Sequence, residues 1–194
     1  MEDAKRSYTT SLDLAKNNWN SKSKKSPESQ SFVRREALRG RALSFLVEGQ
    51  QELALQDIDE ARSLIKATEP QGSNLNIATA VVWLLNGRTR RASTAFKEVL
   101  DSCTQAIELA PSAYAHYYDA FICYVGLLDR TKATEMLELA LERCSARGVL
   151  AMTSELVGLL SKSDDHRQFT KEFVDWIREY DTGPSPPRMG AAHS

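Results

Sequence analysis

The sequence predicts an all-α protein, and three observations support this. From Phe32 onward, apolar residues recur at helical spacing, with almost none of the alternation that is typical of strands. The breaks between these stretches are short and polar. Of the six prolines, Pro27, Pro70 and Pro111 fall between predicted helices rather than inside them. Because helices joined by short turns pack antiparallel to their neighbours, the expected architecture is a series of antiparallel helix pairs.

Composition limits the classes of function that need to be considered. The 194 residues are 42% hydrophobic and carry 25 basic and 26 acidic side chains, for a net charge of -1. This is enough apolar material for a sizeable core, and it leaves no bulk charge to attract nucleic acid or an anionic membrane. No signal peptide and no run of about 20 apolar residues is visible. Three cysteines without a CxxC pair are typical of a reducing compartment, so we expect a soluble, cytoplasmic protein.

The chain divides into three parts by its patterning. Residues 1–31 are predicted to form a helix up to about Trp19 and then a polar linker, because residues 20–31 show no apolar periodicity. Residues 32–180 are the predicted helical repeat domain. Residues 181–194 combine glycine, proline and serine, and we expect them to be a disordered tail.

One pattern of residues recurs three times within the repeat domain. Each copy has an aromatic residue, a turn residue four positions later, and an alanine nine positions after the aromatic one, followed by two more apolar positions of a second helix. The copies are Phe45, Gly49, Ala54, Ile58 and Ala61; Trp83, Gly87, Ala92, Phe96 and Val99; and Tyr124, Leu128, Ala133, Leu137 and Ala140. Small residues allow two helix backbones to approach closely, so the first alanine of each copy is a predicted helix–helix contact.

This pattern resembles the tetratricopeptide repeat over roughly residues 35–145, most clearly in residues 112–141. The resemblance implies an α-solenoid of antiparallel helix pairs, with about three repeats, a C-terminal capping pair and an N-terminal helix. Two departures stand out in the third copy. Leu128 occupies the place of the turn glycine, and the bulky Phe121 occupies a place where a small residue is expected.

The spacing of the copies exceeds the 34 residues typical of the family, and the excess can be located. The second copy continues its apolar register for seven further residues, close to two helical turns, which predicts one long helix from about Thr89 to Leu109. A final pair of helices is predicted at Val149 to Leu160 and at Asp165 to Tyr180. It lacks the alanine pattern, as expected for the capping end of a solenoid.

In the tetratricopeptide family, the first helix of each pair lines a concave groove. The resemblance therefore implies a partner-binding groove that is mostly apolar and suits an amphipathic helix. Its predicted residues are Arg39, Leu43, Asn74, Ile77, Val81, Tyr118, Asp119, Ile122 and Val125. Two alternatives stay open for the apolar face: the terminal helices of the chain fill it, or a second copy of the chain fills it.

Catalytic and metal-binding residues are sparse in the sequence. His116 and Cys123 share a helix face, but their spacing of seven residues places them about 10 Å apart by helical rise alone, too far for a nucleophile and its base. The three cysteines lie on different predicted helices, without the closely spaced ligand pair of a metal site. No phosphate loop or carboxylate dyad is present. We therefore expect no enzymatic activity, no cofactor and no metal.

Two basic stretches suggest weaker alternatives. Arg88, Arg90 and Arg91 precede Ser93, a pattern compatible with a kinase site or a phosphate-binding patch, although a solvated surface explains it more simply. A basic stripe on the first repeat would suit a helical-repeat nucleic-acid binder; it consists of Arg34, Arg35, Arg39 and Arg41. The favoured interpretation is a noncatalytic protein–protein interaction module, an adaptor or scaffold that holds a protein or peptide.

Overall fold

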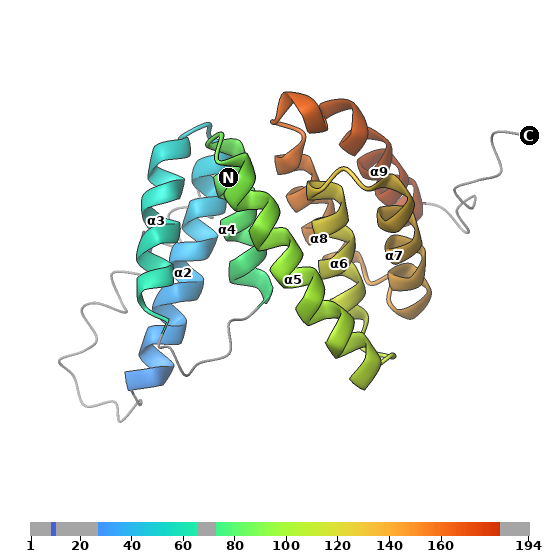
Figure 1. Ribbon diagram of the computed structural model, residues 1–194, viewed down its shortest axis with the longest axis horizontal. Helices are drawn as coiled ribbons and strands as arrows, with labels where there is room; N and C mark the ends of the chain where they lie inside the picture. Colours follow the sequence, from blue (N-terminus) through green and yellow to red (C-terminus); the bar gives the residue numbers. More distant parts are fainter. Residues whose placement is uncertain (1–8, 11–26, 66–72, 183–194) are drawn as a thin grey trace, which may run out of the picture. The chain divides into compact units, whose positions relative to one another are not determined.

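The computed structural model describes residues 9–10, 27–65 and 73–182, and in these residues it is all-helical, without a strand (Figure 1). The all-α prediction is confirmed. The helices are α2 (Pro27–Val47), α3 (Gln51–Ser63), α4 (Ser73–Leu85), α5 (Thr89–Leu109), α6 (Tyr114–Gly126), α7 (Arg130–Arg143), α8 (Arg147–Leu160) and α9 (Asp164–Thr182). The predicted N-terminal helix lies outside the described residues except for Thr9 and Thr10, and the predicted tail lies outside them except for Asp181 and Thr182. These last two residues belong to α9, so the prediction of a disordered tail from residue 181 is wrong for them.

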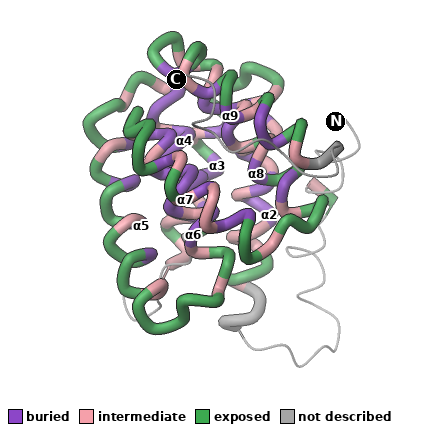
Figure 2. The backbone as a smooth tube through the Cα atoms, turned by 90° about the vertical axis from the view of Figure 1, so that its right-hand side faces the viewer, coloured by how far each residue is buried: buried purple, intermediate pink, exposed green. Residues whose placement is uncertain are grey.

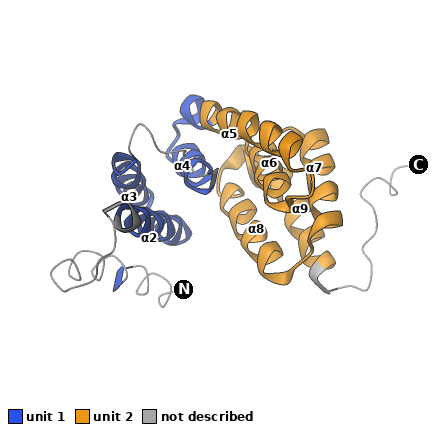
Figure 3. Cartoon of the chain, turned by 90° about the horizontal axis from the view of Figure 1, so that it is seen from below, with its two compact units in different colours: residues 1–92 blue, residues 93–194 orange. Residues whose placement is uncertain are grey.

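The chain forms two compact units, whose boundary lies inside α5 (Figure 3). The first comprises Met1–Ala92 and the second comprises Ser93–Ser194. In the first unit, α4 lies against both α2 and α3, which also pack against each other. In the second unit, α6 packs against α7, α8 and α9, and α8 and α9 pack together. The sequence had indicated one repeat domain over residues 32–180.

Three turns share the same backbone conformation, at the three turn positions that the repeat pattern predicts. Gly49, Gly87 and Leu128 have φ values of 76°, 71° and 60°, and among the described residues these alone have positive φ. In each turn, the amide one residue further on donates to the carbonyl of the repeat's aromatic residue, at 2.8, 2.8 and 3.0 Å. These contacts are those of the Schellman motif, which satisfies the last carbonyls of a helix. The predicted turn positions are therefore confirmed.

The third turn is strained because leucine occupies its left-handed position. That conformation costs an L-residue roughly 1–2 kcal/mol. Replacing the leucine with glycine would remove this cost, but glycine also loses more chain entropy on folding, which offsets part of the gain in stability. We expect Leu128→Gly to raise the free energy of unfolding by about 0.5–1 kcal/mol in urea titrations. Gly49→Ala is the converse variant, since a Cβ there would meet nothing within 4 Å. It should lose about 1 kcal/mol through the backbone alone. A Leu128→Gly variant less stable than the parent would show that the leucine side chain contributes more than its conformation costs.

The three helices that follow these turns, α3, α5 and α7, each bury residues at the same positions relative to the turn. In each copy of the repeat, the residues five, nine and twelve positions after the turn residue are at most 1% exposed. They are Ala54, Ile58, Ala61, Ala92, Phe96, Val99, Ala133, Leu137 and Ala140. Figure 2 shows buried segments in purple, including along α7. The prediction that Ala54, Ala92 and Ala133 are buried is confirmed.

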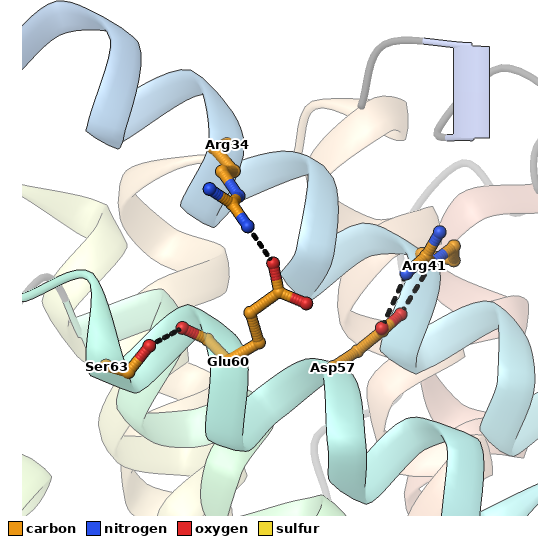
Figure 4. A network of polar contacts seen from close by, with 5 residues as sticks. All are labelled: Arg34, Arg41, Asp57, Glu60 and Ser63. Carbon is orange, nitrogen blue, oxygen red and sulfur yellow. Dashed lines mark hydrogen bonds and ion pairs between the residues drawn. The ribbon is translucent and has the colours of Figure 1, made fainter. Parts of the chain in front are cut away.

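Polar contacts join α2 to α3 along their length (Figure 4). The guanidinium of Arg41 donates from Nε and one terminal nitrogen to the two carboxylate oxygens of Asp57, both at 2.7 Å. Arg34 pairs with Glu60. Ser31 Oγ donates to the carbonyl of Leu64 at 3.0 Å, so the beginning of α2 lies beside the end of α3. Only 7% of the Asp57 side chain is exposed, which makes its pair with Arg41 the most buried ion pair of these contacts.

Each predicted helix bound lies within two residues of the observed one, except at the start of α2. The predicted long helix is α5, Thr89–Leu109, and the predicted final pair corresponds to α8 and α9. However, α2 begins at Pro27, whereas the sequence placed residues 27–31 in the linker. The reason is that proline is favoured in the first turn of a helix, where its missing N–H has no partner to lose. Apolar periodicity does not detect such a polar first turn.

The second unit has an aromatic core centred on α6. The ring of Phe121 meets that of Phe173 from α9 edge to face, with centroids 5.4 Å apart. The imidazole Nε2 of the buried His166 lies 3.0 Å from the carbonyl oxygen of Gly126, at the end of α6. A Cβ on Gly126 would lie 2.5 Å from the fully buried ring of Phe96, so only glycine fits there without movement.

This close approach gives a prediction with a control in the same unit. Gly126→Ala should lower the free energy of unfolding by about 1–2 kcal/mol, because overpacking outweighs the better helix propensity of alanine. Gly158→Ala, inside α8, meets nothing within 4 Å. It should gain about 0.5–1 kcal/mol. Urea unfolding of both variants measures the difference, and equal effects would mean that Phe96 moves aside at no cost.

Candidate functional site

The predicted groove residues lie on the first helices, α2, α4 and α6, and the structure buries most of their apolar members. Ile77, Val81, Ile122 and Val125 are at most 3% exposed. Tyr118 is 4% exposed. A partner helix cannot reach these side chains unless the chain opens, so they act as core residues in this structure.

The remaining groove residues are accessible. Arg39 and Leu43 are half-buried on α2 and, four residues apart, share one face of that helix. The guanidinium Nε of Arg39 donates to Glu36 Oε2 at 3.0 Å, which holds the arginine side chain along the helix. Asn74 is exposed near the start of α4, and Asp119 is half-buried on α6. In the first unit, the predicted recognition surface is thus reduced to Arg39, Leu43 and Asn74.

Tyr118 has a structural role. Its hydroxyl donates to the carbonyl of Cys144 at 2.5 Å, and that carbonyl belongs to the residue that caps the end of α7. Burial raises the pKa of the Tyr118 hydroxyl, and the nearby Cys144 thiol adds to the effect. The phenol is therefore neutral and ties α6 to the end of α7.

A cluster that the sequence did not reveal joins α5 to α6. The side chains of Cys103, His116 and Asp119 each place one potential ligand atom within 4.8 Å of the other two. His116 and Asp119 are three residues apart on α6, so they share a face, and Cys103 reaches them from α5. The sequence spacing alone pairs His116 with Cys123 instead. The only sequence signal for the cluster is the spacing of His116 and Asp119, and nothing in the linear order points to Cys103.

The pKa values of two buried thiols, Cys103 in this cluster and Cys123 further along α6, argue against nucleophilic catalysis by either one. Burial, reinforced by the carboxylate of Asp119, raises the pKa of Cys103 to about 12. Burial also raises the pKa of Cys123 well above its ordinary value. A cysteine nucleophile requires the thiolate, which a lowered pKa favours, and both groups are shifted the other way.

The basic turn before α5 forms an open hollow of about 590 Å³, lined by residues 87–91. Its arginines follow a turn glycine and precede Ser93, which is half-buried. None of these five lining residues is buried. The structure gives it no feature beyond the surface patch that the sequence suggested.

Comparisons with known proteins give no relative: no family model, no curated protein and no solved structure matches this chain. Within the described ranges, none of the helices combines the length and the apolar character needed to cross a bilayer.

Proposed function

We propose that this protein is a noncatalytic interaction scaffold of the tetratricopeptide-repeat type, a stack of antiparallel helix pairs that holds a protein partner. The observation that carries the proposal is the recurrence of one turn. Three turns each have a residue with left-handed backbone conformation, the same pattern of hydrogen bonds and a buried alanine five residues later, at the offsets of the sequence repeat. Repeated supersecondary units of this kind are typical of binding scaffolds, whose stability comes from contacts between neighbouring pairs.

Contacts between first helices support the stacking part of the proposal. In the first unit α2 contacts α4, and in the second α6 contacts α8, and each contact joins the first helices of successive pairs. The turn between α8 and α9 differs from the other three, since none of its residues has a positive φ. This difference fits a capping pair that covers the last apolar face.

The proposed recognition surface is the accessible face of α2 around Arg39 and Leu43. It offers the apolar side chain of Leu43 beside Arg39, whose charge Glu36 balances, so it suits the apolar stripe of a partner helix. The apolar positions of α6, by contrast, belong to a helix that α7, α8 and α9 surround. For that unit we favour the alternative in which the chain fills the face itself.

Nucleic-acid binding is the less favoured alternative. The basic stripe of the first repeat is largely neutralised within the protein, since Arg34, Arg39 and Arg41 pair with carboxylates of Glu60, Glu36 and Asp57. Arginines that bind phosphates must be available to replace counterions along the nucleic-acid backbone.

A capture experiment tests the proposal. The full chain and its Leu43→Asp variant serve as baits in an extract of the source organism, with quantitative mass spectrometry of the proteins retained. We expect Leu43→Asp to lose a specific partner through the burial of an unpaired charge at the interface. Because Leu43 is half-buried, the melting temperature should fall modestly, and circular dichroism checks that the variant is folded.

The control and the alternative outcomes are distinct. Gln56→Asp, an exposed position on α3, should retain the partner. Light scattering after size exclusion tests for a second copy of the chain as the occupant, because Leu43→Asp would then convert a dimer to a monomer. If neither partner capture nor oligomeric state changes in a folded Leu43→Asp variant, the α2 surface is not the recognition site.

A further inference from the structure

The cluster of Cys103, His116 and Asp119 has the geometry of a small chelating site. Around a tetrahedral zinc ion, ligand atoms at about 2.0–2.3 Å from the metal lie roughly 3.3–3.5 Å from one another. The three candidate atoms lie within 4.8 Å of one another. They therefore need to close by at most about 1.5 Å, the difference between 4.8 and 3.3 Å, which side-chain rotation can supply.

The backbone holds these residues in place from two helices. The connection from the end of α5 to the start of α6 is only four residues long, from position 110 to 113. It brings Cys103, which lies six residues before the end of α5, beside the first turns of α6. The pair His116 and Asp119 sits on one face of those turns at a spacing of three residues. Two ligands at this spacing on one helix, with a third from a neighbouring helix, also form the metal sites of helical bundles.

The donor set selects the type of metal. A thiolate, an imidazole and a carboxylate are the three protein ligands that zinc accepts, and three of them leave a fourth position for water or another ligand. Magnesium and calcium prefer oxygen ligands and do not match a buried thiol. His116 is half-buried rather than sealed inside, so an ion has a way to the site.

We propose that Cys103, His116 and Asp119 bind one zinc ion, which joins α5 to α6. On binding, the Sγ–H bond of Cys103 breaks, the sulfur electron pair forms the bond to zinc, and the proton passes to water. His116 contributes the lone pair of a neutral ring nitrogen and Asp119 contributes a carboxylate oxygen. None of these ligands belongs to the proposed recognition surface on α2. The zinc proposal can therefore be tested independently of the scaffold function.

Metal titration of the full chain tests the proposal. The protein, without a histidine tag and stripped by a chelator, is titrated with zinc and, in parallel, with cobalt(II) as a spectroscopic probe. We expect one ion per chain and, with cobalt, a near-ultraviolet sulfur-to-metal charge-transfer band together with visible bands of tetrahedral coordination. Zinc at about 100 times its Kd should raise the melting temperature by roughly 5–10 °C. Magnesium should do neither.

Variants assign the ligands. Cys103→Ser should abolish the charge-transfer band, and His116→Gln and Asp119→Asn should each weaken zinc binding at least about 10-fold. Cys144→Ala, a half-buried cysteine of the same unit, is the matched control and should bind zinc like the parent. Circular dichroism of each apo variant checks that it is folded.

Two results would overturn the proposal, and one of them does not depend on any variant. If the parent chain shows neither a stoichiometric zinc site nor a cobalt charge-transfer band, no metal site is present. If the band survives in Cys103→Ser but disappears in Cys123→Ala, a metal is bound by a different set of ligands from the one assigned here.

Discussion

Val81→Asp and Ile122→Asp are each expected to lower the free energy of unfolding by at least about 3 kcal/mol. Both positions are on first helices, and they are 0% and 3% exposed. Each change removes a buried aliphatic side chain and leaves a carboxylate without a partner in the core, and an uncompensated buried charge alone costs about 3–5 kcal/mol. Thermal and urea unfolding, followed by circular dichroism, measure the loss.

The control is Met152→Asp on α8, an apolar side chain that is 54% exposed. The same charge is introduced into a helix there, but water solvates it, so the change should stay within about 0.5 kcal/mol. Should Val81→Asp melt at the parent's temperature, its side chain would be accessible after all. That result would support the prediction from sequence, in which a partner helix occupies an open apolar groove.

Much of the fold could be predicted because the repeat pattern encodes local geometry. A residue that follows the aromatic by four positions must enter the left-handed region to end the helix, which explains why Gly49 and Gly87 are glycines. The spacing of the repeat also predicts a turn at Leu128, which adopts the same left-handed conformation although leucine does not favour it. The bounds of α5 followed from the same reasoning, since an insertion of two turns extends a helix without changing its buried face.

The candidate site was harder to predict because it depends on contacts between helices. An apolar first-helix position looks the same in sequence whether a partner covers it or α8 and α9 of the same chain do. The proximity of Cys103 to His116 likewise depends on the crossing of α5 and α6, which the linear spacing of thirteen residues does not specify. From the sequence, the cysteine that can be placed on the same helix face as His116 is Cys123, which lies seven residues further along α6.

The ion pair of Arg41 and Asp57 illustrates the same limit, since it joins two helices across sixteen residues. Arg41→Met is expected to cost about 3–5 kcal/mol, because it leaves the Asp57 carboxylate buried without its bidentate partner. A double variant, Arg41→Met with Asp57→Leu, should recover most of that loss, since it removes the stranded charge as well. Urea unfolding with unchanged m-values would show that the loss is one of stability.

A second, exposed ion pair shows whether the loss of stability in Arg41→Met comes from the burial of Asp57. Arg130 pairs with Glu172, and these side chains are 54% and 44% exposed. Water and salt screen such a pair, so Arg130→Met should cost at most about 1 kcal/mol. If Arg41→Met costs no more than Arg130→Met, Asp57 must be solvated when its partner is removed. In that case apolar packing would hold α2 and α3 together, and the ion pair would add little.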